Sequence, residues 1–171
     1  MKAYQIFQHI SPELAVEIFS YLRGNEKDTF KGLVASLAEQ RKLRPIFVLK
    51  KTPDDQIAWL CKTARLKFAD GADEHVLQTW LLNNQRDLLI SFLDSMGIEH
   101  DGKGSVDNLP DTLDADKLKS TADQLLENNP EEIVKVYLHV FQLQRSNGWP
   151  TLGDLLENDA RLCFTSVEAS A

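Results

Sequence analysis

Three segments of the chain begin with a capping residue, a proline and an acidic residue. They are Ser11-Pro12-Glu13, Thr52-Pro53-Asp54 and Asn129-Pro130-Glu131. A Ser, Thr or Asn side chain at the N-cap accepts a backbone N–H, and proline suits the first helical position because a backbone N–H there would have no partner. The acid then lies near the positive end of the helix dipole. Each segment therefore predicts the start of a helix.

Apolar residues recur at helical spacing along most of the chain, which predicts an all-α fold. The helix that begins at Pro53, for example, is expected to bury Ile57, Leu60, Cys61, Ala64 and Phe68. A spacing of three or four residues places such side chains on one stripe of a helix. We expect an irregular antiparallel bundle of about seven helices.

Glycines and polar residues predict where these helices begin and end. Gly24 and Gly97 are expected at helix C-termini, where the left-handed conformation suits glycine. Thr151 is expected to cap a short last helix. Asn83-Asn84 divides the apolar pattern between residues 73 and 96, and either one bent helix or two helices fits that pattern.

The run Ile46-Phe47-Val48-Leu49 is the one stretch with strand character. β-Branched and aromatic residues favour strands, but four residues need a partner strand, and the sequence offers none. We expect this run to be an extended connector that is tucked into the core.

A length of 171 residues, of which 43% are hydrophobic, is enough for a substantial core. We expect one helical domain, 1–171, built as a single bundle or as two packed lobes, 1–70 and 71–160, with a frayed tail at 165–171. Residues 1–70 contain 12 Lys and Arg against 8 Asp and Glu, whereas residues 71–171 contain 7 against 18. This asymmetry can steer the halves onto one another or attract a charged partner.

The sequence lacks an apolar run of the roughly 18 residues that a membrane-spanning helix needs, and its first ten residues lack a signal-peptide pattern. We therefore expect a soluble cytoplasmic protein without membrane insertion. Cys61 and Cys163 lie far apart among apolar neighbours and without CxxC spacing. We expect both to be reduced thiols that contribute to packing.

Five basic residues surround the short apolar run: Arg41, Lys42, Arg44, Lys50 and Lys51. Lys and Arg neutralise phosphate groups, so this segment is a candidate binding site for a phosphate ligand or nucleic acid. A solvated surface explains the same residues, because bases near a helix C-terminus are favoured by its dipole. The net charge of −7 and the lack of a nucleic-acid motif argue against a general nucleic-acid binder.

His100-Asp101, followed by Gly102-Lys103, is a second candidate site. The string resembles one carried by HD-type phosphohydrolases, an all-α family that holds one or two divalent metals with a His, a His-Asp doublet and a further Asp. The resemblance implies a metal set of His75, His100 and Asp101 with Asp154 or Asp159. In that family the doublet lies on a helix, whereas Gly97 is expected to end the helix here. An ordered, tethered connector between two helices explains the loop without a metal.

Other catalytic signatures are absent from the sequence. Gly102-Lys103-Gly104 lacks the spacing of a phosphate-binding loop, the same loop fails the EF-hand pattern, and neither cysteine lies in a nucleophile motif. We therefore expect a non-enzymatic interaction or adaptor protein that needs no cofactor and binds another protein, or itself as a homodimer. The alternatives are a metal-dependent phosphohydrolase centred on His100 and Asp101, and a phosphate or nucleic-acid binder that uses the segment Arg41 to Lys51.

Overall fold

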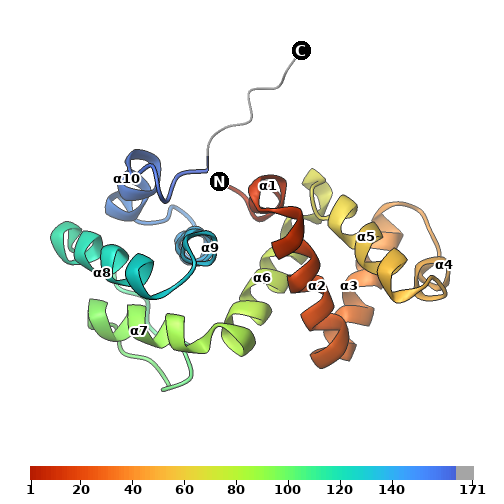
Figure 1. The fold of residues 1–171 in the computed structure, drawn as a ribbon, viewed down its shortest axis with the longest axis horizontal. Coiled ribbons are helices and arrows are strands. Elements are labelled where there is room, and N and C mark those ends of the chain that lie inside the picture. Colours follow the sequence, from red (N-terminus) through yellow and green to blue (C-terminus); the bar gives the residue numbers. More distant parts are fainter. Residues whose placement is uncertain (165–171) are drawn as a thin grey trace, which may run out of the picture. The chain divides into compact units, whose positions relative to one another are not determined.

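A computed structural model describes residues 1–164, which form ten α-helices and one short 3-10 helix (Figure 1). The first elements are α1 (Ala3–His9), α2 (Pro12–Asn25), α3 (Lys27–Gln40), α4 (Pro45–Leu49), α5 (Pro53–Thr63) and the 3-10 helix η1 (Lys67–Ala69). The others are α6 (Asp70–Asn84), α7 (Arg86–Met96), α8 (Ala115–Asn128), α9 (Glu131–Leu143) and α10 (Pro150–Asn158). These residues contain no strand, so the predicted all-α class is confirmed.

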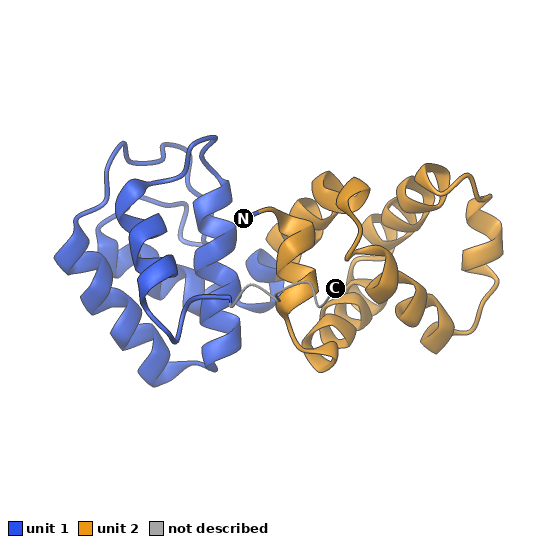
Figure 2. Ribbon diagram, turned by 90° about the horizontal axis from the view of Figure 1, so that it is seen from above, with its two compact units in different colours: residues 1, 81–171 blue, residues 2–80 orange. Residues whose placement is uncertain are grey.

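The chain divides into two compact units (Figure 2). One comprises residues 2–80, and the other comprises residues 81–171 together with Met1. The division falls inside α6, whereas the lobes expected from the sequence meet between residues 70 and 71. Residues 2–80 contain 12 Lys and Arg against 10 Asp and Glu, and residues 81–171 contain 7 against 16. The tail expected at 165–171 lies outside the described residues.

The unit of residues 2–80 is built around an apolar interior. Within it α2 packs against α3 and α5, and α4 packs against α3 and α5. The rings of Phe7 and Phe19 stack with their centroids 5.2 Å apart, and both side chains are fully buried together with Ile18, Leu22 and Leu60. Burying an apolar side chain of this size stabilises a protein by about 1.5–3 kcal/mol. This core holds α2, α3 and α5 in place around the site described below.

The unit of residues 81–164 has an aromatic core. Phe141 meets Phe92 edge-on at 5.0 Å between centroids and stacks on Trp149 at 4.9 Å. The indole N–H of Trp149 donates to the carbonyl of Pro110 at 2.8 Å. Leu113, near the end of the connection from α7 to α8, is buried. This long connection is therefore tied to the core, as an ordered connector requires.

Several predicted helix ends are confirmed. The side chains of Ser11 and Thr52 each accept the backbone N–H three residues further on, at 3.2 and 3.3 Å. Gly97 ends α7 in the left-handed conformation, with φ of 72°. The apolar pattern of residues 73–96 forms two helices, since α6 ends at Asn84 and α7 begins at Arg86.

Three other predicted helix ends are wrong. α9 begins at Glu131 with Pro130 as its N-cap, so Asn129 does not cap this helix. α2 continues through Gly24 to Asn25, so this glycine does not end the helix. Thr151 lies inside α10, which begins at Pro150. The Thr151 hydroxyl donates to the carbonyl of Leu113 at 3.1 Å, so a tertiary contact uses the group that was expected to cap the helix.

Short elements account for further differences from the sequence-based expectation. Phe68 is exposed, not buried, because α5 ends at Thr63 and the chain turns into η1. The described residues contain ten α-helices where about seven were expected, partly because α6 and α7 are separate and α4 is helical. No helix in residues 1–164 combines the length and the apolar character needed to cross a bilayer.

The run Ile46-Phe47-Val48-Leu49 forms α4, so the prediction of an extended connector is wrong. Of its four residues only Val48 is buried. Pro45 occupies the first helical position, where its ring sets a helical φ, and Arg44 before it is extended, as a residue preceding proline prefers. Without a partner strand an extended backbone would leave its N–H groups unpaired. In the helix the N–H of Lys50 instead donates to the carbonyl of Ile46 at 3.0 Å.

Asp73 lies on the buried face of α6. Its side chain is fully buried, and neither carboxyl oxygen has a hydrogen-bond partner among the described residues. Burial, together with the negative charge of Asp70, raises the pKa of Asp73 to about 9. The carboxyl group is therefore protonated and neutral at pH 7 in the folded protein.

The raised pKa of Asp73 predicts that the protein loses stability as pH rises from about 4 to about 9. In this range the folded state holds a proton that the unfolded state has released, so the free energy of unfolding falls by up to about 1.4 kcal/mol per pH unit. Asp73→Asn removes this dependence and should become progressively more stable than the wild type as pH rises. Urea unfolding across the pH range measures the difference.

Asp54→Asn is the matched control, because Asp54 is an exposed acid in the same unit. Its stability relative to the wild type should change much less over the same pH range. Parallel pH curves for the wild type and Asp73→Asn would contradict the assignment of a neutral buried carboxyl.

Candidate functional site

The loop that contains His100 and Asp101 is held by local hydrogen bonds. The Asp101 carboxylate accepts the backbone N–H groups of Lys103 at 2.7 Å and Ser105 at 3.0 Å. These two bonds lower the pKa of Asp101, and the loop exposes this carboxylate to solvent. Nε2 of His100 lies 2.9 Å from the Asp94 carboxylate. Both candidate ligands therefore serve the turn that follows α7.

The implied metal set gains no support from this geometry. Within residues 1–164, no three His, Cys, Asp or Glu side chains are arranged so that they could hold a metal ion. His75 is exposed on α6. Asp159 is engaged by the Arg161 side chain, which lowers the pKa of Asp159. Asp154 is exposed on α10.

The basic segment begins where α3 ends. Lys42 adopts a left-handed conformation with φ of 56°, and the N–H of Leu43 donates to the carbonyl of Ala38 at 2.8 Å. This bond closes the C-terminus of α3 in the manner of a Schellman cap, with a lysine in the place that glycine usually takes. Arg44 then extends the chain to Pro45, where α4 starts.

The short helix α4 presents apolar side chains to solvent. Phe47 is 63% exposed, Ile46 is 47% exposed and Leu43, just before the helix, is 40% exposed. Val48 is buried and anchors α4 to the unit. We name the surface formed by Leu43, Ile46, Phe47 and the five basic residues Arg41, Lys42, Arg44, Lys50 and Lys51 the α4 patch.

The basic side chains of the α4 patch have no carboxylate partner among residues 1–164. All five are exposed, and none of them forms an ion pair with any residue of the described chain. Neighbouring like charges repel one another, and an opposite charge close by would offset this repulsion. The patch therefore combines unneutralised positive charge with exposed apolar surface.

Gln56 attaches this segment to the unit. Its side chain is buried on α5, and its amide N–H groups donate to the carbonyls of Leu49 at 2.9 Å and Lys51 at 3.1 Å. Its amide oxygen accepts the Nε–H of Arg23 at 3.0 Å. One buried amide thus provides hydrogen-bond donors for the carbonyls at the C-terminal end of α4 and orients an arginine of α2.

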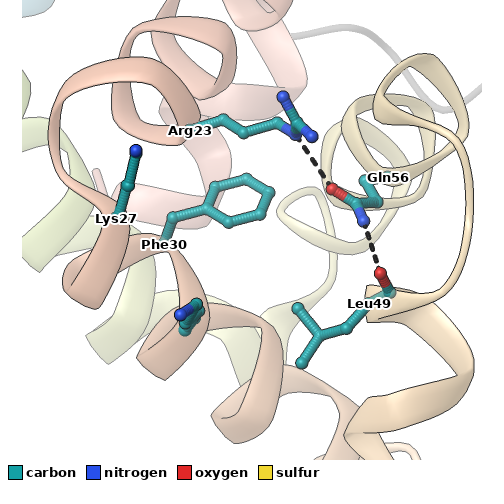
Figure 3. A pocket seen from close by; sticks show the side chains of 6 residues that line it. Arg23, Lys27, Phe30, Leu49 and Gln56 are labelled. Carbon is teal, nitrogen blue, oxygen red and sulfur yellow. Dashed lines mark hydrogen bonds between the residues drawn. The ribbon is translucent and has the colours of Figure 1, made fainter.

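A cavity of about 420 Å³ lies beside Gln56, and we name it the Phe30 pocket (Figure 3). It is lined by Arg23, Lys27, Phe30, Lys31, Leu49 and Gln56. Figure 3 shows the ring of Phe30 among the other labelled side chains, with Arg23 reaching across to Gln56. Helices α2, α3, α4 and α5 all contribute to its wall.

Sequence reasoning identified the basic segment but missed Gln56 and the Phe30 pocket. Gln56 precedes Ile57 by one residue and Leu60 by four, so it falls on the apolar stripe of α5. A polar residue on such a stripe is a detectable signal. The pocket left no comparable signal, because its basic residues come from two helices and look like an ordinary solvated surface.

Comparison with protein-family models, with curated proteins and with solved structures gives no match for this chain.

Gln56→Ala should loosen the basic segment. The substitution leaves two backbone carbonyls and the Arg23 guanidinium without their partner, which costs about 1–3 kcal/mol of unfolding free energy. Amide hydrogen exchange at Lys50 and Lys51, whose N–H groups bond within the α4 turn, should accelerate. Urea unfolding and exchange measured by NMR test both effects.

Gln40→Ala provides the control, since Gln40 is exposed at the end of α3. It should change stability by less than about 0.5 kcal/mol. Unchanged stability and exchange in Gln56→Ala would show that Gln56 does not hold the segment.

Proposed function

We propose that this protein is a non-enzymatic interaction protein that binds a partner protein through the α4 patch. The observation that carries this proposal is the exposure of Leu43, Ile46 and Phe47 within five residues of the chain. Single exposed apolar side chains are ordinary, but a group framed by polar residues is typical of interaction sites. Aromatic residues and arginine are enriched in the cores of protein interfaces, and the patch offers both.

The charge of the α4 patch defines the partner. Five cations that form no ion pair within the described part of the chain surround the apolar side chains, so a complementary surface carries Asp or Glu around an apolar anchor. Binding would bury Phe47 and Ile46 and would neutralise the cations at the rim. Electrostatic complementarity of this kind sets specificity and association rate, and burial of the apolar side chains supplies affinity.

The two alternative functions have less support. Nucleic acid could use the same cations and could stack a base on Phe47, but Leu43 and Ile46 are aliphatic and would stay exposed in such a complex. A phosphohydrolase would need a group of metal ligands, and the described part of the chain contains none. Binding of an acidic protein would use both the charged and the apolar side chains of the α4 patch.

We also propose that this interaction takes place in the cytoplasm. Cys61 and Cys163 are both free thiols, as a reducing compartment maintains them. Burial raises the pKa of Cys61, which keeps it as an unreactive thiol.

Selection from a peptide display library tests the proposed function. Peptides that carry Asp or Glu around Phe, Trp or Leu should be enriched, and their binding should weaken as salt is added. Ile46→Ala/Phe47→Ala should weaken binding of the selected peptides by roughly thirty-fold or more, because loss of burial of one such side chain is worth about 2 kcal/mol. Fluorescence anisotropy with labelled peptides measures the change.

Leu66→Ala/Phe68→Ala is the matched control, since it removes a similar exposed apolar pair from the same unit but outside the α4 patch. It should leave the affinity within about two-fold. Equal losses in both double variants, or enrichment of peptides without acidic residues, would contradict the proposal. Sedimentation of the wild type and Ile46→Ala/Phe47→Ala shows whether the acidic partner is a second copy of this chain.

A further inference from the structure

The Phe30 pocket gathers three cations around an apolar floor. Arg23, Lys27 and Lys31 line it, none of the described residues that line it is Asp or Glu, and Phe30 and Leu49 supply the apolar surface. Asp28 lies in the same turn of α3 as Lys27 but does not line the cavity. A cavity of about 420 Å³ falls in the range of roughly 300–1,000 Å³ that holds small ligands in proteins.

The positions of the two lysines are unfavourable for the isolated helix. Lys27 is the first residue of α3, where the helix dipole is positive and a basic side chain is disfavoured. Lys31 follows it by four residues, so two like charges lie on neighbouring turns of one face. Neither lysine forms an ion pair with a residue of the described chain. An anion in the pocket would offset both unfavourable interactions at once.

Arg23 is oriented in advance for such an anion. Its Nε–H donates to Gln56 at 3.0 Å, and Gln56 is itself fixed by its bonds to the carbonyls of Leu49 and Lys51. Among the described residues, no hydrogen bond occupies the two terminal nitrogens of the guanidinium. A guanidinium with both terminal nitrogens available binds a phosphate or carboxylate through two parallel hydrogen bonds.

The number of cations favours a doubly charged anion. A phosphate monoester carries about −1.5 to −2 charges at neutral pH and offers three acceptor oxygens, which matches one arginine and two lysines better than a single carboxylate does. The ring of Phe30 and the side chain of Leu49 then offer a contact to an apolar group on the same ligand.

We propose that the Phe30 pocket binds a phosphate monoester that carries an apolar group, with Arg23, Lys27 and Lys31 holding the phosphate and with Phe30 and Leu49 contacting the apolar group. This site is separate from the apolar surface of the α4 patch. Evidence against the proposed protein partner would therefore not be evidence against this site.

Titration with small probes, followed by NMR and calorimetry, tests the site. Phenyl phosphate should bind in a saturable way and shift the backbone amides of residues 23–31 and 49–56. Inorganic phosphate should bind about tenfold or more weakly than phenyl phosphate, because it lacks the apolar contact. Benzoate should also bind more weakly than phenyl phosphate because it carries one charge, and phenol, which carries none, should not bind. A phosphotyrosine peptide that binds much more tightly than phenyl phosphate would identify a phosphorylated protein as the source of the ester, and equal affinities would identify a small molecule.

Lys27→Ala/Lys31→Ala should weaken binding of phenyl phosphate by about tenfold or more, since two charge-assisted contacts are lost. Lys62→Ala/Lys67→Ala removes the same charge from exposed positions of the same unit and should change the affinity by less than about twofold. Ile46→Ala/Phe47→Ala should bind phenyl phosphate as the wild type does.

Three results would overturn the assignment. They are the absence of saturable binding of phenyl phosphate, equal losses in the two double-lysine variants, and amide shifts outside the pocket. All four lysines are exposed, so circular dichroism of the variants should match the wild type and a loss of binding would not reflect unfolding.

Discussion

The buried amide of Gln56 is the interaction on which the candidate surfaces depend. It joins α5 to two other helices, because it donates to the carbonyls of Leu49 at the end of α4 and of Lys51 just after it, and accepts the guanidinium N–H of Arg23 from α2. Removing a buried amide that donates to two backbone carbonyls lowers the stability of the fold by more than the net energy of the two hydrogen bonds. The carbonyls are then left desolvated and without partners. The end of α4 and one wall of the Phe30 pocket are fixed by the same side chain.

This attachment explains how α4 remains ordered while it exposes so much apolar surface. The helix has only five residues, too few to be stable by itself, and it buries only Val48. Its position is set by Pro45 at one end and by Gln56 at the other. The side chains of Ile46 and Phe47 are therefore not needed for the core, which leaves them available for a partner.

Charge is used differently in the two units. In residues 2–80 several basic side chains gather without a carboxylate partner among the described residues, and the one fully buried acid of this unit, Asp73, is held neutral by its surroundings. In residues 81–164 the acids are used locally: Asp101 closes a turn, Asp114 caps α8 and Asp159 binds Arg161. Unsatisfied charge is a better indicator of function than net charge, because paired charges are already neutralised within the fold.

The sequence by itself determined the helical class, the starts of α2 and α5 and the end of α7 at Gly97. These features depend on neighbouring residues only, through helical periodicity, N-caps and the left-handed conformation of glycine. It also identified the five cations of the α4 patch. Only the tertiary structure decided that residues 46–49 are helical and exposed, that Thr151 bonds to Leu113, that Asp73 is buried, and that Gln56 joins Arg23 to α4. Each of these depends on which groups lie close together across long stretches of chain, and local patterns carry no information about that.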